Sequence, residues 1–533
     1  MHADVVEQRA ADAYARGLWV HGTLADALDE AARVTPHRVA VIDGDVELDC
    51  ATLRSQDTTV AQALLARMPT GSVVSFMLPN WHEAAVVYLA ATLAGMAVNP
   101  ILPSLRDREL SFILDDVGSR ALFVPQEFRG FDYRSMADRV TAAMATPPEV
   151  VVVRGDHGGH GDDTAYASLL EPQAAAGPPM PELNPDAVRM ILYTSGTTGR
   201  PKGVLHSHNS IHALICQIRD NWRVQPGDTF LVPSPIAHIG GSIYAFECPL
   251  LLGATAVLMQ RWDPDEAVRI MEARQCTHMA GATPFLEGLL ASAERASTRL
   301  PALKVFICGG ASVPPSLIRR AAAYFDSAVV TRVYGSTEVP VTTVGSPDDP
   351  QHAADTDGRP GIAHVKLVGH DAAPPGSGEI RARGPQMLVG YRNPGDEHGA
   401  FDDDGYFRTG DLGRWVDGDY LTVTGRAKDI IIRSGENIAP KEVEDILAGH
   451  PGIAEVAIVG LPDARTGERA CAVIVPAGPA HPDVAALRDF LTGRGVAMFK
   501  VPEQVVIADG LPKNDAGKVL KHQIRAALTK ADE

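Results

Sequence analysis

The chain has 533 residues, which is too long for one ordinary hydrophobic core and predicts a large region with at least one further domain. Hydrophobic residues make up 45% and charged residues 21%, which excludes a disordered chain and a collagen. The formal net charge of −18 repels phosphates and anionic lipids, so we expect no nucleic acid or anionic membrane as a partner.

Three further features bear on where the protein is located: its cysteines, its N-terminus and its apolar stretches. Six cysteines lie along the chain without a CxxC pair, so neither a zinc site nor a disulfide framework is expected. Residues 1–19 contain acidic side chains and no apolar signal core. The longest apolar stretch, Ala84–Val98, is too short to span a bilayer and predicts a buried helix. We therefore expect a cytoplasmic protein with no membrane span.

The first part of the chain repeats one unit, in which a short apolar strand leads into a Gly/Ser/Thr-rich loop and then a helix. A helix is expected at Trp81–Gly95. The expected strands are Val73–Leu78, Ala121–Val124, Val150–Val153, Met190–Tyr193, Phe230–Val232, Ala254–Met259, Val305–Cys308 and Ala328–Val333. This alternation predicts an α/β fold of parallel or mixed sheets flanked by helices. Ligands of such folds bind at the carboxyl ends of strands, where the loops Thr194–Gly203, Gly309–Ser312 and Gly335–Glu338 follow.

The C-terminal part has a different pattern. Short strands and tight turns begin near Gly378, and a compact region runs from Lys428 to the end. Its expected elements are the helices Lys441–Ala448 and Val484–Arg494, the strands Ala454–Val459, Ala470–Val475 and Gln504–Ile507, and a terminal helix. This order predicts a small α+β domain at residues 428–533 behind a large domain at residues 1–427.

The most specific motif is Tyr193-Thr-Ser-Gly-Thr-Thr-Gly-Arg-Pro-Lys-Gly203. Its glycines let backbone N–H groups turn inward, its hydroxyl side chains add donors, and Lys202 supplies a point charge, a combination that suits a polyphosphate. Pro201 stands where a Walker A loop requires the glycine of Gly-Lys-Ser/Thr, so this is a different phosphate loop.

The loop resembles the phosphate-binding signature of the adenylate-forming superfamily, which contains acyl-CoA synthetases, the adenylation domains of peptide synthetases and beetle luciferases. Further signatures follow in the family's order: Pro235–Gly241, Tyr334–Glu338, Gly378–Ile380 with Arg383–Gly384, Tyr406–Asp411, Gly425–Asp429 and Pro512–Lys518. The likeness, closest to medium-chain and cyclohexanecarboxylate ligases, implies a large domain that includes a small distorted barrel, and a small mobile C-terminal domain.

The resemblance also implies an ATP site. The residues expected to bind ATP or AMP are Thr194, Ser195, Gly196, Thr197, Thr198, Gly199, Lys202, Gly310, Ala311, Arg332, Tyr334, Gly335, Ser336, Thr337, Asp411, Arg426 and Lys518. The Tyr334 ring would stack on adenine, Asp411 would accept the ribose hydroxyls, and Arg426 would contact the nucleotide. Glu338 and Thr198 would hold Mg²⁺ through oxygen ligands.

Three residues are expected to be catalytic, namely Lys518, His238 and Lys202. Formation of an acyl-adenylate gathers negative charge around one phosphorus, so the reaction needs Mg²⁺ and a mobile cation. Lys518 follows Gly517 at the end of a glycine-containing turn and is our candidate for that cation. His238 would wall the acid pocket and steer the carboxylate or thiol, without acting as a general base.

Lys428 matches the position of the family's inter-domain hinge. We expect the small domain to rotate about Lys428–Asp429 after adenylation, so that Lys518 leaves the site and the loop Arg433–Ile438 enters it. Ser434, Gly435 and Glu436 would then line a thiol channel. This loop resembles the acyl-CoA synthetase form, which favours coenzyme A (CoA) as the thiol.

The resemblance implies an acid pocket built from His238, Ile239, Gly240, Gly241, Ser242, Gly309, Gly310, Gly335 and Val339. Many of these residues are small, which leaves volume and predicts a bulky or medium-length apolar acid: cyclic, aromatic, terpenoid or medium-chain. No acidic residue stands in these segments before Glu338 to bind an α-amino group, which argues against amino acids.

We therefore expect an AMP-forming acid–thiol ligase: acid and ATP give acyl-AMP and pyrophosphate, and CoA then gives acyl-CoA and AMP. One alternative is a stand-alone adenylating enzyme whose acyl-AMP passes to a carrier protein or partner enzyme. Another is a catalytically silent binding homologue, against which the intact Lys202, Glu338, Asp411 and Lys518 argue. The oligomeric state stays open, with a homodimer among the alternatives.

Overall fold

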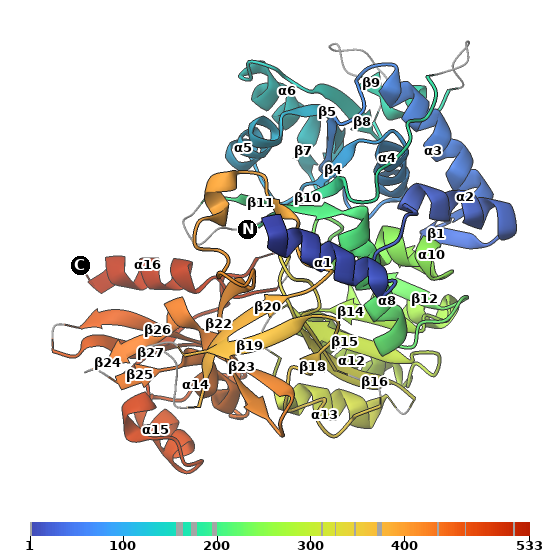
Figure 1. Ribbon diagram of the computed structural model, residues 1–533. Helices are drawn as coiled ribbons and strands as arrows, with labels where there is room; N and C mark the ends of the chain where they lie inside the picture. The colour runs from blue at the N-terminus through green and yellow to red at the C-terminus, as the bar shows by residue number, and fades with distance from the viewer. Residues whose placement is uncertain are drawn as a thin grey trace.

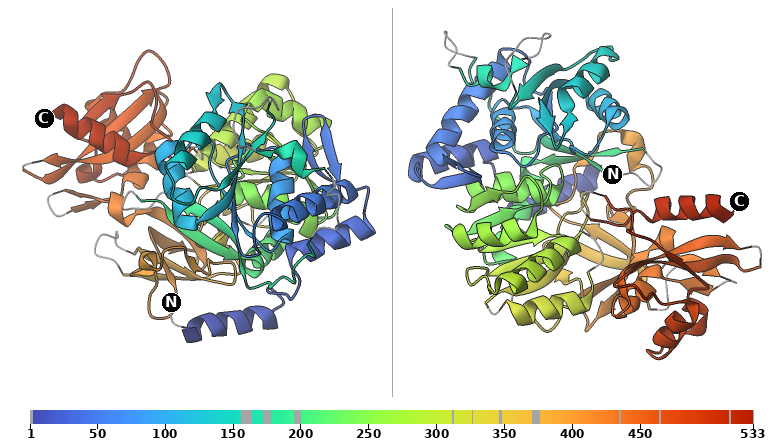
Figure 2. Two further views of the ribbon diagram at one scale, coloured as in Figure 1. Left: turned by 90° about the horizontal axis from the view of Figure 1, so that it is seen from above. Right: turned by 180° about the vertical axis from the view of Figure 1, so that it is seen from behind.

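The computed structural model describes residues 3–155, 164–171, 178–194, 200–310, 313–325, 327–345, 348–369, 376–433, 436–463, 465–514 and 517–532. Two large sheets with their helices form most of the molecule, and a smaller C-terminal unit lies to one side of them (Figure 1 and Figure 2). This mixed α/β architecture, with a large N-terminal domain and a smaller C-terminal one, is the predicted fold class.

The first large sheet has the strand order β18-β17-β16-β15-β14-β12-β13-β1-β2. The bounds are β18 (Arg359–Pro360), β17 (Thr343–Val344), β16 (Val329–Tyr334), β15 (Val305–Gly309), β14 (His278–Gly281), β12 (Thr229–Val232), β13 (Thr255–Leu258), β1 (Val39–Asp43) and β2 (Val46–Asp49). The strands from β16 to β1 are all parallel, so their carboxyl ends lie along one edge of the sheet.

The second large sheet has the order β21-β11-β10-β4-β3-β5-β8-β9. The bounds are β21 (Gly390–Tyr391), β11 (Lys202–Ser207), β10 (Val188–Thr194), β4 (Ala97–Pro100), β3 (Val73–Phe76), β5 (Ser119–Pro125), β8 (Glu149–Val153) and β9 (Thr164–Ala165). β10 and β11 are antiparallel, with Thr194 opposite Lys202. The phosphate loop therefore joins two strands of a hairpin, whereas the repeating unit predicts a strand followed by a helix. Lys202 consequently begins a strand and is not a loop residue.

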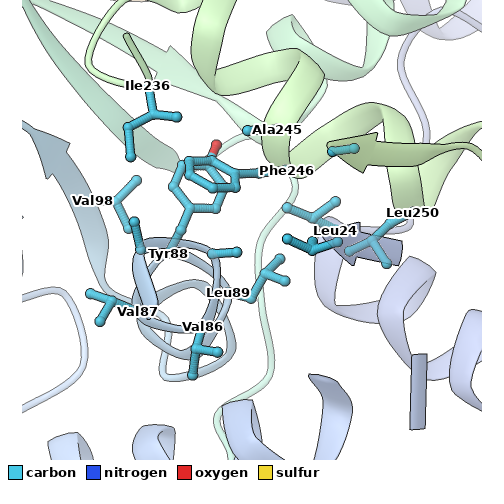
Figure 3. Close-up of a cluster of buried hydrophobic side chains, with 14 of the residues drawn as sticks. Leu24, Val86, Val87, Tyr88, Leu89, Val98, Ile236, Ala245, Phe246 and Leu250 are labelled. Carbon is cyan, nitrogen blue, oxygen red and sulfur yellow. The ribbon is translucent and has the colours of Figure 1, made fainter. Parts of the chain in front are cut away.

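Helix α4 (His82–Leu93) fills the space between the two sheets, where it contacts β1 of one and β4 of the other. Every residue from Glu83 to Leu93 is buried. Figure 3 shows Tyr88 of this helix close to Phe246, and the two ring centroids are 4.4 Å apart. A helix that is apolar on all sides has no face for water and must be enclosed. The buried helix predicted for Ala84–Val98 is confirmed as far as Leu93, whereas Ala97 and Val98 belong to strand β4.

The remaining α-helices of the large domain, and one π-helical turn, precede or connect the strands. They are α1 (Ala3–Ala15), α2 (Leu24–Val34), α3 (Cys50–Leu65), α5 (Asp107–Val117), α6 (Tyr133–Ala142), α7 (Tyr166–Leu169), α8 (His208–Asn221), α9 (Ile239–Ser242), the π-helical turn η1 (Ile243–Glu247), α10 (Cys248–Leu251), α11 (Pro264–Ala273), α12 (Thr283–Ala296) and α13 (Pro315–Tyr324). None of the helices in the described ranges is long and apolar enough to cross a bilayer.

Where a small distorted barrel is expected, the described strands form a four-stranded antiparallel sheet. Its strands are β19 (His364–Val368), β20 (Gly378–Arg383), β22 (Phe407–Val416) and β23 (Tyr420–Arg426). The short helical turn η3 (Ala427–Asp429) follows β23 and leads to the small domain. The predicted boundary at residues 427 and 428 falls within this turn.

The small domain is built on a five-stranded sheet with three α-helices. Its elements are β24 (Ile431–Arg433), β25 (Glu436–Ile438), α14 (Pro440–Leu447), β26 (Ile453–Asp463), β27 (Gly467–Pro476), α15 (Val484–Thr492), β28 (Gln504–Ile507) and α16 (Lys521–Asp532). The helices and strands predicted for this region are all present. Its core is separate from those of the large domain and includes Ile431, Val443, Ile458 and Leu487.

A buried ion pair lies beside the central helix. Glu247, at the end of η1, pairs with Arg189 of β10 at 2.8 Å and accepts a hydrogen bond from the Tyr88 hydroxyl at 2.5 Å. Side-chain exposure is 2% for Arg189 and 1% for Glu247, so each charge depends on the other.

We predict that Glu247→Leu lowers the melting temperature, because it leaves the buried Arg189 guanidinium without its anion at a cost of about 3–5 kcal/mol. Differential scanning calorimetry measures the effect. In the control variant Arg189→Met with Glu247→Leu both charges are removed, and most of the loss should be recovered. If Glu247→Leu alone were as stable as the wild type, this role of the ion pair would be contradicted.

Candidate active site

Several predicted segments meet at one edge of the nine-stranded sheet. The strands β12, β14, β15 and β16 are successive neighbours, and the segments of interest follow their carboxyl ends. Gly309 pairs with Val333, so the loops after β15 and β16 leave the sheet side by side. The Ser234 hydroxyl donates to the Ala280 carbonyl at 3.4 Å, which joins the segment before His238 to β14.

Asp411 is the centre of a buried polar cluster. Its Oδ2 accepts a hydrogen bond from the Tyr334 hydroxyl at 2.8 Å, and its Oδ1 lies 2.8 Å from Nε of Arg426. Arg426 faces Asp411 directly across the β22–β23 pair. A carboxylate offers about four lone-pair positions, so both oxygens retain capacity for the two hydroxyls of a ribose.

Lys518 approaches this cluster from the small domain. Its turn is held by Asn514, whose side chain accepts a hydrogen bond from the Lys518 N–H at 2.8 Å, and by Gly517, which has φ +78°. A Cβ on Gly517 would lie 3.0 Å from Cγ of Pro284 in α12, so the turn rests directly on the large domain. Burial, and then the Arg426 guanidinium, lower the pKa of Lys518 to about 8, against the opposing effect of nearby carboxylates.

Glu338 and Lys202 are linked through Tyr391. The Tyr391 hydroxyl donates to Oε1 of Glu338 at 3.0 Å, and the Lys202 ammonium lies 5.4 Å from the centre of the same ring. Tyr391 is in β21, which pairs with β11 and thereby connects the phosphate hairpin to the Glu338 loop. Tyr391 is absent from the residues predicted from the sequence, because a lone aromatic after a glycine carries no chemical signature of its own.

The groups around Glu338 fit Mg²⁺ and a polyphosphate. Glu338 is only partly buried and offers a hard oxygen ligand, and Mg²⁺ in phosphate sites is held by one or two carboxylates together with phosphate oxygens. Asp396 lies 2.8 Å from the Arg200 guanidinium and 3.9 Å from the Lys202 ammonium, so it anchors both cations at the end of the hairpin.

Eight of the predicted residues lie outside the described residues. They are Ser195, Gly196, Thr197, Thr198, Gly199, Ala311, Ser434 and Gly435. The predictions for the centre of the phosphate loop, the second metal ligand and two thiol-channel residues therefore stay predictions.

Hydrogen bonds to its backbone carbonyls hold the loop after β16 in place. The Thr337 carbonyl accepts a hydrogen bond from Nε2 of His206 at 2.8 Å, and the Glu338 carbonyl accepts one from the Leu388 N–H at 2.7 Å. Burial lowers the pKa of His206 to about 4, so the ring is neutral at pH 7 and its proton lies on Nε2, toward the carbonyl. The side chains of Ser336, Thr337 and Glu338 are partly exposed.

The glycines of the expected acid pocket differ in what surrounds them. A Cβ on Gly240 or Gly310 would meet no atom within 4 Å. On Gly241 it would lie 2.1 Å from the Pro235 carbonyl oxygen, and on Gly309 it would lie 2.3 Å from a methyl carbon of Val333. Close backbone packing therefore requires glycine at positions 241 and 309, and the positive φ of +81° favours it at position 310, so only Gly240 supports the predicted pocket volume.

The prediction that Arg332 contacts the nucleotide does not agree with its place in the structure. Its guanidinium forms an ion pair with Asp357 at 2.6 Å and donates to the Ala354 carbonyl at 3.0 Å, and the residue is 3% exposed. This placement gives Arg332 the role of tying β16 to the segment before β18, and its side chain does not face a nucleotide as predicted.

Two residues of the expected acid pocket also point elsewhere. Val339 is fully buried in a cluster with Leu388 and Tyr391, beneath the loop. The Ser242 hydroxyl is buried and directed to Sδ of Met190, 3.7 Å away. Both side chains are buried in the core and do not line open space.

His238 and Ile239, in contrast, are partly exposed at the start of the α9–α10 helical segment. The His238 carbonyl accepts the Ser242 N–H at 2.9 Å, which fixes where this segment begins. At the domain junction Lys428 is exposed within η3, and Glu436 is exposed at the start of β25.

Two family models cover most of the chain. The model of the AMP-binding enzyme matches residues 28–392, and that of the AMP-binding enzyme C-terminal domain matches residues 442–518. The chain belongs to the AMP-binding enzyme family. The second match contains Lys518 at its last position, and the first ends one residue after Tyr391.

Individual relatives agree with this assignment. This AMP-binding enzyme is 33% identical to the medium-chain fatty-acid–CoA ligase of Escherichia coli K12, over 97% of this chain and 93% of the relative. It is 34% identical to the salicyl-AMP ligase / salicyl-S-ArCP synthetase of Mycobacterium tuberculosis, over 97% of this chain and 92% of the relative. The crystal structure of ATP-bound MatB from Rhodopseudomonas palustris matches with a TM-score of 0.83 at 27% identity, over 96% of this chain and 100% of that one. The predicted class, an AMP-forming acid–thiol ligase, is confirmed.

We predict that Tyr391→Phe raises the KM for Mg·ATP about tenfold, because partners that orient a metal ligand contribute about 10–100-fold to affinity. ATP–pyrophosphate exchange at varied Mg²⁺ concentration measures it. Tyr14→Phe is the matched control, since the Tyr14 hydroxyl bonds Asp186 and not the Glu338 loop. An unchanged Mg²⁺ dependence in Tyr391→Phe would count against Glu338 as a metal ligand.

The lowered pKa of Lys518 predicts a pH profile. The ammonium is present below pH about 8 and lost above it, so kcat/KM for adenylation, which reports the free enzyme, should fall as the pH rises through that value. Lys518→Arg keeps its charge throughout and should flatten this descending limb at a lower absolute rate. A wild-type profile that stays flat to about pH 10, near the usual pKa of lysine, would contradict the prediction.

Proposed function

We propose that this enzyme is an ATP-dependent carboxylic acid–CoA ligase for a bulky or medium-length apolar acid. The observation that carries the proposal is the meeting of Lys518 with Asp411 and Arg426 at the domain junction. It brings a cation from the small domain beside the group that suits a ribose, which is the arrangement that acyl-adenylate formation requires.

In the first half-reaction, a carboxylate oxygen of the acid attacks the α-phosphorus of ATP, and the bond to the leaving pyrophosphate breaks. Asp411 holds the ribose, and Lys202 faces the polyphosphate. Lys518 neutralises the charge that gathers on the α-phosphoryl group. Mg²⁺, when bound at Glu338, neutralises charge on the polyphosphate.

In the second half-reaction, the sulfur of CoA attacks the acyl carbonyl carbon, and AMP leaves. The proposal assigns Lys428, exposed in η3, as the hinge about which the small domain turns between the two steps. Lys518 withdraws, and the Arg433–Ile438 loop with Ser434, Gly435 and Glu436 shapes the thiol channel.

The class of acid rests on the open space at Gly240, which follows His238 and Ile239 in the chain. Two relatives are named for a medium-chain fatty acid and for salicylate, which supports an apolar acid of the aliphatic or the aromatic type. We also propose a cytoplasmic location, because the six cysteines are free and buried, as is usual in a reducing compartment.

A second candidate acceptor is a carrier protein. One relative, at 34% identity, is named a salicyl-S-ArCP synthetase, which indicates a protein-bound thiol there. In that case the adenylation half-reaction is unchanged, and only the acceptor that follows it differs.

The test is a panel of carboxylic acids assayed by ATP–pyrophosphate exchange, followed by addition of CoA and detection of acyl-CoA by mass spectrometry. We expect exchange with cyclic, aromatic, terpenoid or medium-chain acids, and acyl-CoA with the same acids. Exchange without acyl-CoA would favour the carrier protein, turnover of only acetate or an amino acid would overturn the acid class, and no exchange with any acid would favour a silent homologue.

The hinge has its own prediction. Lys428→Pro should leave pyrophosphate exchange near the wild-type rate but slow acyl-CoA formation about tenfold or more, because proline restricts the backbone rotation that the second step needs. Lys428→Ala removes the same side chain without restricting the backbone and should behave like the wild type. Intact overall turnover in Lys428→Pro would show that no rotation occurs there.

A further inference from the structure

Val341, three residues after Glu338, has a left-handed backbone with φ +48°. In the part of the chain that the structure describes, it is the only β-branched residue with a positive φ. A β-branched side chain clashes with its own backbone in this region, so such a conformation persists only where its surroundings enforce it.

Gln217 of α8 is the side chain that holds Val341. Its Nε2 donates to the Val341 carbonyl at 2.8 Å, and its Oε1 accepts a hydrogen bond from the Ile362 N–H at 2.6 Å. Both ends of the amide are used, so its orientation is fixed. Gln217 is 1% exposed, and Gly361 leaves room for it, since a Cβ there would lie 1.9 Å from its Oε1.

The left-handed turn at Val341 closes the loop that carries Thr337 and Glu338. A Cβ on Gly335 would lie 2.6 Å from the Val341 nitrogen, so the two ends of the loop touch through their backbones. Inside the loop, the Val339 carbonyl accepts the Ser336 N–H at 3.2 Å. A change in φ at Val341 would separate these ends and move Glu338.

We propose that Gln217 is a positioning residue that holds Val341 in its left-handed conformation and so sets the geometry of Thr337 and Glu338 for Mg·ATP. The inference rests on the proposed function of this loop. Gln217 contacts neither the acid nor the nucleotide in this account. Its effect passes through one hydrogen bond to a residue 124 positions away in the chain.

The test combines two substitutions. Gln217→Leu keeps a side chain of similar length in a buried site but removes both hydrogen bonds, and it should lower kcat/KM for Mg·ATP in pyrophosphate exchange about tenfold, since a displacement of about 1 Å costs up to 100-fold. Val341→Gly should stay near the wild-type rate, because glycine adopts a positive φ without help. In the double variant most of the Gln217→Leu loss should therefore be recovered.

A matched control is Asn221→Leu, one turn further along α8, where Nδ2 bonds the Gln217 carbonyl and does not touch the loop. It should leave the exchange kinetics unchanged. If Val341→Gly weakens folding, Val341→Asn replaces it, because asparagine enters the left-handed region more readily than valine.

Hydrogen–deuterium exchange of Gly335–Thr342 gives a readout that does not depend on turnover. Gln217→Leu should speed exchange in this segment, and Asn221→Leu should not. Wild-type kinetics and protection in Gln217→Leu, or an equal loss with and without Val341→Gly, would overturn the proposal. If the wild type showed no pyrophosphate exchange with any acid tested, the proposed function would fail. The hydrogen–deuterium exchange of the loop would still test whether Gln217 holds Val341.

Discussion

The buried carboxylate of Asp411 joins the four-stranded sheet to the nine-stranded sheet. It lies on the four-stranded sheet, accepts a hydrogen bond from Tyr334 of the nine-stranded sheet, and pairs with Arg426, which ends the strand before the small domain. A buried carboxylate without partners would be costly, so these contacts fix both the sheets and the charge at one point. The site is therefore assembled where the domains meet.

The site also concentrates positive charge in a chain whose net charge is −18. Lys202 lies near Asp396, and Arg426 pairs with Asp411. These carboxylates hold the cations in place before any substrate arrives. Lys518 differs, because burial, and then the Arg426 guanidinium, lower its pKa, and because its turn belongs to the small domain. Among these three cations of the described residues, Lys518 is the one that the C-terminal unit contributes.

Small residues near the site serve two different purposes. Gly309 and Gly335 allow backbones to touch, while Gly240 leaves open space. The sequence alone does not separate these roles, because a glycine looks the same whether a neighbouring chain or a substrate occupies the place of its missing side chain. The same limit applies to Arg332, whose place just before the Tyr334–Glu338 motif led to the prediction of a nucleotide contact, although its guanidinium pairs with Asp357.

The sequence by itself determined the elements and the chemistry. Apolar runs between loops gave the strands, the apolar run after Trp81 gave the buried helix α4, and the ordered motifs gave Lys518, Asp411 and Glu338 as site residues. Only the tertiary structure decided that Lys202 begins a hairpin strand, that Tyr391 reaches Glu338 and that Gln217 holds Val341. These contacts join residues far apart in the chain, and each depends on which strands become neighbours, which local pattern does not specify.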